Sequence, residues 1–245
     1  MRQTTPRPEL LACRAAPAAR VTAPTRPAAM VRRTKEDALA TRSALLDAAE
    51  CVFQQRGVAG TSLGDIARAA GLTRGAIYWH FKDKAELFNA MMERVTLPLE
   101  SDLAGLADAP GDPIAQLRRR VRRAVRQIAR DERTRRVLEI ATLMVEYVDD
   151  LGPVRERHVR SHRANVALLA QALTRAAALR RQRLPAPAAQ LAEGLHALTH
   201  GLVHGWLVDP SFNLERTLAA AFDAYLAGIG LPPRAAPDRG APDQG

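Results

Sequence analysis

The sequence of 245 residues predicts an all-α fold of about nine helices, arranged as a small three-helix domain followed by a larger helical domain. Apolar residues recur every three or four positions along most of the chain, and Ser, Thr or Asp precedes several of these segments as a helix cap would. Gly and Pro separate the segments, and no run alternates apolar and polar residues as a half-buried strand does. These three observations exclude a β or α/β class.

The first helix is expected over residues 35–56. Leu46, Val52 and Phe53 share one of its faces, and Gly57 follows it, where a left-handed residue commonly ends a helix. The apolar face predicts that this helix packs against the two helices that come next.

Those two helices are short, over residues 62–70 and 73–80, with Gly71 in the turn between them. Ser62 and Thr73 stand at their N-cap positions. Two short helices joined by a glycine turn are typical of a helix-turn-helix motif.

Acidic residues reinforce the predicted helix starts. Asp65 stands at the reciprocal capping-box position for Ser62, and Asp83 with Glu86 forms a further capping pair. The second pair predicts that a long helix, over residues 83–106, begins directly after the motif.

The second short helix carries the chemistry that a DNA-binding surface needs. Gly75 and Ala76 are small enough for close approach to a duplex, and hydrogen-bond donors surround them, namely Thr73, Arg74, Tyr78, His80 and Lys84. The chain has only ten aromatic residues, yet Tyr78, Trp79 and Phe81 lie within four positions, which predicts a specialised surface. A packed three-helix unit that binds no nucleic acid is the alternative.

The segment TSLGDIARAAGLTRGAIYWHFKDKAELF, residues 61–88, resembles the amino-terminal domain of the tetracycline-repressor (TetR) family, with Leu72 where Val is usual. Together with MVRRTKEDALATR, residues 30–42, it most resembles the multidrug-efflux repressors of the AcrR and TtgR kind. The resemblance is strong over residues 30–95 and weak beyond them.

The resemblance implies that Thr73, Arg74 and Gly75 enter the major groove, while other residues of the motif and of its flanks bind phosphates. Residues just ahead of the first helix could reach the adjacent groove or phosphates, and their loss should weaken binding without changing the preferred sequence. The complete set expected at DNA is Arg32, Arg33, Lys35, Ser62, Thr73, Arg74, Gly75, Tyr78, Trp79, His80 and Lys84.

The rest of the chain is expected to be helical. Predicted helices cover residues 113–130, 132–149, 152–182, 187–207 and 213–229. Residues 118–136 are rich in Arg around an apolar stripe, which favours a solvated helix face over a second DNA contact.

A homodimer is expected, because one short recognition helix covers only a few base pairs and two copies can meet two half-sites. The last two predicted helices carry apolar faces that could form the contact or could be intramolecular core. These faces are Leu191, Leu195, Leu198 and Leu202, and Leu218, Phe222, Tyr225, Leu226 and Ile229. The resemblance implies a four-helix interface made of two such pairs.

Apolar residues of the central helices provide enough material for a ligand cavity, although periodic Leu and Met are equally typical of plain core. The resemblance implies a cavity for a small hydrophobic or aromatic inducer, whose binding releases the operator. The residues expected to line it are Met92, Val95, Leu138, Thr142, His196, Thr199, His200 and Val203.

Histidines suggest a rival form of regulation. His158 and His162 form one series at four-residue spacing, and His196, His200 and His204 form another, so each series shares a helix face. A metal- or pH-responsive TetR-type regulator is therefore the alternative. No cofactor is expected.

The formal net charge of +10 indicates an acidic partner such as double-stranded DNA. Residues 1–33 hold seven Arg against one acid and read as a disordered basic extension. Two interpretations stay open for it, an incorrectly extended start before Met30 and a real arm that binds phosphates. The domains expected are residues 1–33, the helix-turn-helix domain 34–84, the ligand-binding and dimerisation domain 85–230, and a disordered tail 231–245.

Other classes of protein fit the sequence poorly. No apolar run approaches the roughly 18 to 20 residues of a membrane helix, so a cytoplasmic protein is expected. Glycine-rich phosphate loops and motifs of hydrolases or metalloproteases are absent from the sequence, so no enzyme is predicted. A protein that coats DNA without sequence preference is a third class, and competition with random DNA distinguishes it from a repressor.

Overall fold

The computed structural model describes residues 35–104, 110–145 and 151–233, without the side chains of residues 99–104. Nine helices and no strand occur in these ranges, which confirms the all-α prediction. The helices are α1 (Lys35–Arg56), α2 (Leu63–Ala69), α3 (Arg74–Tyr78), α4 (Lys84–Ala104), α5 (Pro113–Arg130), α6 (Glu132–Leu143), α7 (Gly152–Arg180), α8 (Ala188–Val208) and α9 (Leu214–Gly228).

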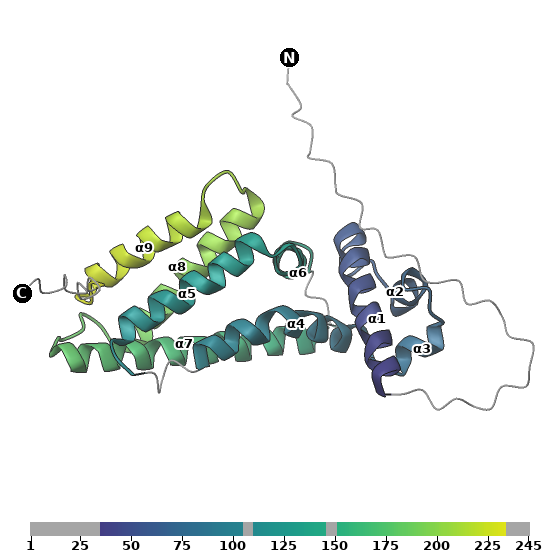
Figure 1. Ribbon diagram of the computed structural model, residues 1–245, viewed down its shortest axis with the longest axis horizontal. Helices are drawn as coiled ribbons and strands as arrows, with labels where there is room; N and C mark the ends of the chain where they lie inside the picture. Colours follow the sequence, from purple (N-terminus) through teal and green to yellow (C-terminus); the bar gives the residue numbers. More distant parts are fainter. Residues whose placement is uncertain (1–34, 105–109, 146–150, 234–245) are drawn as a thin grey trace, which may run out of the picture.

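The first three helices form a unit at one end of the molecule, and α4 runs from it into the larger helical body (Figure 1). There α4 packs along α7, α8 lies against α7 and α9, and α5 packs against both α7 and α9. The short α6 contacts α1, α4 and α5, so it stands at the junction of the two parts.

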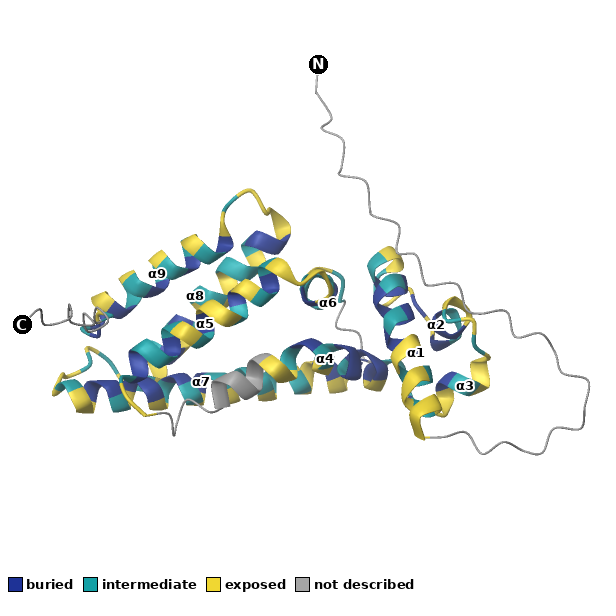
Figure 2. Cartoon of the chain, viewed as in Figure 1, coloured by how far each residue is buried: buried dark blue, intermediate teal, exposed yellow. Residues whose placement is uncertain are grey.

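Two apolar clusters hold these helices together. The first joins the inner faces of α1–α4, where the rings of Phe53 and Phe88 are 6.0 Å apart, and it continues into α6 through Val137 and Ile140. The second joins α5, α7, α8 and α9 around Leu173. Figure 2 shows buried positions alternating with exposed ones along α5, α8 and α9, as amphipathic helices require.

The predicted apolar face of the first helix is confirmed, because Leu46, Val52 and Phe53 are buried in one cluster with Ile66 and Ile77. Apolar side chains at helical spacing can leave water only by packing on neighbouring elements. The helix ends where expected, since Gly57 adopts a left-handed φ of 74°.

Among the predicted helix ends that differ from the structure, two have a clear structural cause. The third helix, expected to reach residue 80, is α-helical only to Tyr78, because the chain turns there: both His80 and Phe81 donate their backbone N–H to the carbonyl of Ile77. The sixth, expected to reach residue 149, ends at Leu143 with Met144 as its C-cap, and the carbonyl of Met144 instead accepts from Val58 N at 3.3 Å.

No described helix is both long enough and apolar enough to span a bilayer. The extension expected over residues 1–33 and residues 234–245 of the expected tail lie outside the described residues. Leu231, which was expected in the tail, is buried in the second cluster.

Candidate nucleic-acid interface and internal cavity

The candidate DNA-binding surface is the outer side of α3 and the turn after it. Thr73, Arg74 and Gly75 are exposed, Tyr78 is 49% exposed and Trp79 is 89% exposed. Ile77, on the opposite side of the same helix, is fully buried and anchors α3 to the first apolar cluster. Tyr78 and Trp79, adjacent and both exposed, are therefore available for contact with a partner. The guanidinium of Arg74 stands 5.9 Å from the centre of the Tyr78 ring, within cation–π range.

The helix caps that hold this surface are those predicted. Ser62 Oγ accepts from Asp65 N at 3.2 Å while the Asp65 carboxylate accepts from Ser62 N at 3.1 Å, a complete capping box. Thr73 Oγ1 accepts from Ala76 N at 3.2 Å at the start of α3. Each cap satisfies backbone donors that the first turn of a helix leaves unpaired. Hydrogen bonds from Ser62 lower the pKa of the Asp65 carboxyl, with smaller help from nearby arginines.

The third capping pair differs from the predicted form. Asp83 Oδ1 accepts from Glu86 N at 2.7 Å as expected, but the Glu86 carboxylate accepts from Lys82 N at 2.8 Å instead of from Asp83. The reciprocal bond thus reaches one residue further back and secures the turn between α3 and α4.

Lys84 is the first residue of α4, and its ammonium donates to the carbonyls of Val58 at 2.9 Å and Ala59 at 3.2 Å. It therefore ties the start of α4 to the loop between α1 and α2. An ammonium has three donors, so these two bonds leave room for one phosphate contact. The predicted DNA contact of Lys84 stays a prediction, and the structure adds a role in positioning.

Phe81 does not belong to the specialised surface that the sequence predicts for Tyr78, Trp79 and Phe81. Its side chain is 1% exposed and belongs to the first apolar cluster, and the guanidinium of Arg42 lies 4.9 Å from its ring centre. The turn after Tyr78 causes this, because it directs Phe81 inward and leaves Tyr78 and Trp79 outside. His80 is half-buried between them, with its ring centre 6.4 Å from that of Phe81.

The remaining residues expected at DNA lie at or before the start of α1. Lys35 opens this helix and is exposed. Arg32 and Arg33 lie outside the described residues.

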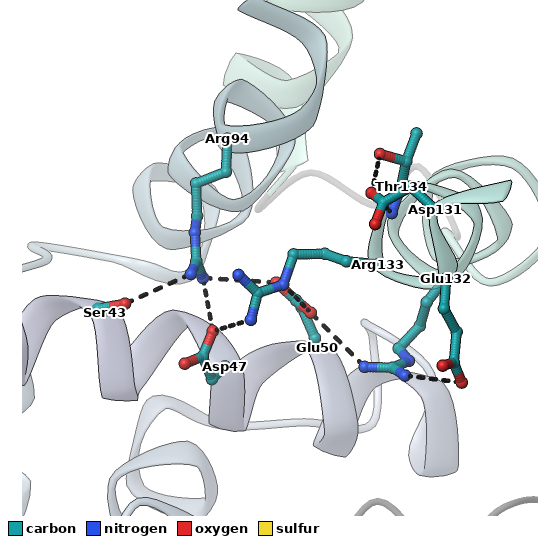
Figure 3. A network of polar contacts seen from close by, with 9 residues as sticks. Ser43, Asp47, Glu50, Arg94, Asp131, Glu132, Arg133 and Thr134 are labelled. Atoms are coloured by element: carbon teal, nitrogen blue, oxygen red, sulfur yellow. Dashed lines mark hydrogen bonds and ion pairs between the residues drawn. The ribbon is translucent and has the colours of Figure 1, made fainter. Parts of the chain in front are cut away.

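A buried ion network, which the sequence did not reveal, joins the N-terminal unit to the body (Figure 3). Glu50 of α1 is 1% exposed, and its carboxylate lies 3.4 Å from Arg94 of α4 and 3.5 Å from Arg133 of α6. Arg136 approaches it at 3.7 Å, and Asp47 pairs with Arg94 at 2.9 Å. Burial raises the pKa of Glu50, and the three arginines oppose that rise.

The predicted solvated face over residues 118–136 is confirmed on α5, where Arg126 and Arg130 are 59% and 69% exposed although both pair with Glu215 of α9, at 3.3 and 3.2 Å. Arg133 and Arg136 of α6 are the exceptions, because they bind the buried Glu50. The signal that could have revealed the network is Glu50 itself, a carboxylate beside Ala49 on an otherwise apolar helix face.

A cavity of about 300 Å³ opens among α4–α8. Its apolar side includes Phe88 and Met92 of α4, Ile128 of α5, and Leu138 and Val203 of α6 and α8. The size lies at the lower end of small-ligand sites, about 300 to 1,000 Å³.

Most of the residues that the sequence analysis expected to contact an inducer line this cavity. They are Met92, Leu138, Thr142, His196, Thr199, His200 and Val203. Val95 does not line the cavity, because α4 turns it into the first apolar cluster, where it is buried. Sequence reasoning missed Arg157 of α7, which lines the cavity while it donates to Thr96 Oγ1 at 2.8 Å and pairs with Glu93 at 3.7 Å.

All five histidines of the two series line the same cavity. The rings of His162 and His196 are edge to face, with their centres 4.6 Å apart. The ring centre of His200 lies 6.3 Å from that of His158 and 6.1 Å from that of His196. Burial and the neighbouring imidazoles lower the pKa of both His196 and His200. Within the described residues, no group of three or more His, Cys, Asp or Glu has metal-binding geometry.

Comparison with known families assigns both parts of the chain. Residues 45–91 match the model of bacterial regulatory proteins of the tetR family, and residues 112–230 match the C-terminal region of the MAATS-type transcriptional repressors.

Individual relatives agree with this assignment. The HTH-type transcriptional regulator TtgR of Pseudomonas putida is 38% identical over 189 residues, which cover 74% of this chain and 87% of TtgR. NalD, described as the secondary repressor of the MexAB-OprM multidrug efflux pump in Pseudomonas aeruginosa, has 37% identity and a TM-score of 0.73 over 80% of this chain and 98% of its own. SmeT of Stenotrophomonas maltophilia in complex with triclosan has 35% identity and a TM-score of 0.71, over 81% and 100%. The chain therefore belongs to the TetR family of transcriptional regulators.

Proposed function

We propose that this protein is a repressor that binds a palindromic operator as a homodimer, is released by a small hydrophobic or aromatic inducer, and controls a multidrug efflux operon. The observation that carries the proposal is the path of α4. Its first residue, Lys84, holds the loop before the recognition motif, and Met92, two turns later, lines the cavity. One rigid helix therefore connects the proposed ligand to the proposed DNA surface.

A second connection runs through α6. Leu138 and Thr142 line the cavity, while Arg133 and Arg136 of the same helix bind Glu50 of α1. A ligand that binds better when α4 and α6 are displaced shifts the N-terminal unit and lowers operator affinity. Coupling energies of this kind are typically about 1 to 3 kcal/mol.

The surface proposed for dimerisation differs from the faces expected from the sequence. Leu195 of α8 and Leu218, Phe222 and Leu226 of α9 are buried within the protomer, so they form intramolecular core. The exposed faces of the same two helices support the proposal instead. They carry small or apolar residues, namely Ala197, Gly201 and Val208 on α8 and Ala220, Ala224 and Ala227 on α9. Small side chains allow close packing of helices from two copies.

The relatives support the two remaining parts of the proposal, the efflux operon and the aromatic inducer. NalD and SmeT are each described as a repressor of a multidrug efflux pump, and SmeT forms a complex with triclosan. Control of an efflux operon and binding of an aromatic inducer are proposed for this chain by that analogy.

The proposal is tested with the full chain and a fluorescent duplex from the region upstream of its own gene. We expect binding that survives excess scrambled DNA at physiological salt and that weakens when triclosan or another apolar aromatic compound is added. Light scattering should show a dimer in solution and on the duplex. Equal competition by scrambled DNA would instead identify a protein that coats DNA without sequence preference.

A further inference from the structure

The polar side of the cavity has an unusual charge composition. Among the described residues that line it, the ionisable side chains are those of Arg157 and the five histidines, and there is no Asp or Glu. From α5 and α6, only uncharged residues among those described face the cavity, such as Ile128 and Thr142. An organic cation that entered this space would find no described counter-charge on the wall.

The nearest acids stand behind the basic groups, outside the cavity wall. Glu193 of α8 lies 3.2 Å from His162 Nε2 and is half exposed. Glu93 of α4 pairs with Arg157 at 3.7 Å and is about equally exposed. Each acid therefore pairs with a basic residue of the cavity wall without lining the cavity itself, and each is partly screened by solvent.

Two of these imidazoles resist protonation in the protein. Burial and the charges of His158, His162, His200 and His204 hold the pKa of His196 and His200 below the ordinary value, with only Glu193 acting in the opposite direction on His196. Both imidazoles are therefore protonated less readily than an ordinary histidine. An anion placed beside them favours the imidazolium and raises the pKa again.

We propose that the cavity selects weakly acidic aromatic compounds, bound as anions beside the imidazoles of His162, His196 and His200, in preference to aromatic cations of the same size. The inference rests on the proposed function, because it specifies the chemical class of the inducer. The aromatic body lies on the apolar side, against Phe88, Met92 and Leu138. The acid group points to α7 and α8, and a proton enters from solvent onto an imidazole as the anion binds.

The test uses three probes that share one aromatic body, namely 1-naphthoate, 1-naphthamide and 1-naphthylmethylammonium. Calorimetry on the full chain at neutral pH should show that the carboxylate binds about tenfold or more tighter than the cation, which is the scale of one charge-assisted hydrogen bond. Titration in two buffers of different ionisation enthalpy should reveal net proton uptake for the carboxylate and none for the amide. Affinity for the carboxylate should rise as the pH falls from 8 to 6, because carboxylic acids stay ionised until about pH 4.

Two variants locate the effect. His196→Gln combined with His200→Gln should remove the preference for the carboxylate and most of the proton uptake, because Gln keeps a polar group but cannot be protonated. The matched control is Arg160→Gln on α7, which removes a positive charge from an exposed side chain outside the cavity wall and should change neither quantity.

The measurements on the unmodified chain decide the inference even if the double variant fails to fold. Equal or tighter binding of the ammonium compound, binding of the carboxylate without proton uptake, or no binding of any of the three would overturn it. Operator release by triclosan alongside any of these results leaves the proposed function intact. If no aromatic compound releases the operator, the proposed function itself has failed.

Discussion

Glu50 of α1 and Arg94 of α4 are joined at 3.4 Å although the Glu50 side chain is almost completely removed from solvent. Arg133 and Arg136 reach the same carboxylate from α6. One buried charge thereby holds together the helix that supports the recognition motif and the two helices that border the cavity. Rearrangement of these ion pairs is a physical route by which displacement of α4 or α6 can move α1.

Glu50→Ala should destabilise the protein by on the order of 2 kcal/mol, because three guanidinium groups lose the buried side chain that they share and a cavity is left in its place. Urea unfolding measures this change. Glu132→Ala is the matched control, since Glu132 also pairs with Arg136 but is 61% exposed, and its loss should cost less than about 0.5 kcal/mol. Equal effects of the two substitutions would show that burial of Glu50 is energetically unimportant.

The titration of Glu50 should have a pH effect of defined sign. Burial raises the pKa of Glu50, so the folded protein holds its proton to higher pH than the unfolded chain does. The contribution of this group to the free energy of unfolding is therefore greatest in acid and falls as pH rises from the ordinary carboxyl value through the raised one. Comparison of unfolding curves between pH 4 and pH 7 should show that this slope is absent from Glu50→Gln.

Asp131 should show the opposite pH dependence. It caps α6 by accepting from Thr134 N at 2.9 Å, and the hydrogen bonds from Thr134 lower its pKa. Its stabilising effect is present above the ordinary carboxyl pKa and is lost as the pH falls through the lowered value. Asp131→Ala should cost about 1 kcal/mol near neutral pH and less in acid, while Asp131→Asn should keep most of the cap. A cost of Asp131→Ala that does not shrink in acid would contradict this account.

Arg74→Ala should weaken operator binding by about 1 to 3 kcal/mol and relax sequence preference, because Arg74 is exposed on the recognition helix. Its effect on unfolding should stay within about 0.5 kcal/mol. Arg160→Ala, on the exposed side of α7, is the control for loss of one positive charge. Fluorescence anisotropy with specific and scrambled duplexes measures both the affinity and the sequence preference. Unchanged sequence preference in Arg74→Ala would show that this residue does not read bases.

Lys84→Met should combine two effects that are measured separately. Loss of the bonds to the carbonyls of Val58 and Ala59 should destabilise the N-terminal unit by about 1 to 3 kcal/mol. Loss of a phosphate contact should in addition reduce the slope of log affinity against log salt by about 1. A lower stability with an unchanged salt slope would assign Lys84 a positioning role alone.

The local parts of the fold could be predicted from the sequence because their causes are local. Ser62 and Thr73 cap helices through bonds to residues three positions away, and Gly57 ends α1 through its own backbone conformation. Apolar periodicity likewise identified the buried faces of α1 and α5. The end of α3 was predicted two residues too late. The helix stops at Tyr78 because the chain turns there and buries Phe81, and the core that receives Phe81 is formed by other helices.

The sequence by itself determined the helical class, the recognition motif with its caps, and the helix faces that bear the two histidine series, since each of these follows from residues within a few positions of one another. Only the tertiary structure decided that both histidine series line one cavity whose described lining residues include no Asp or Glu, that Val95 belongs to the core, and that Glu50 is shared by arginines from two distant helices. These relationships join residues that are more than thirty positions apart, and periodicity along one helix carries no information about which neighbour its face meets.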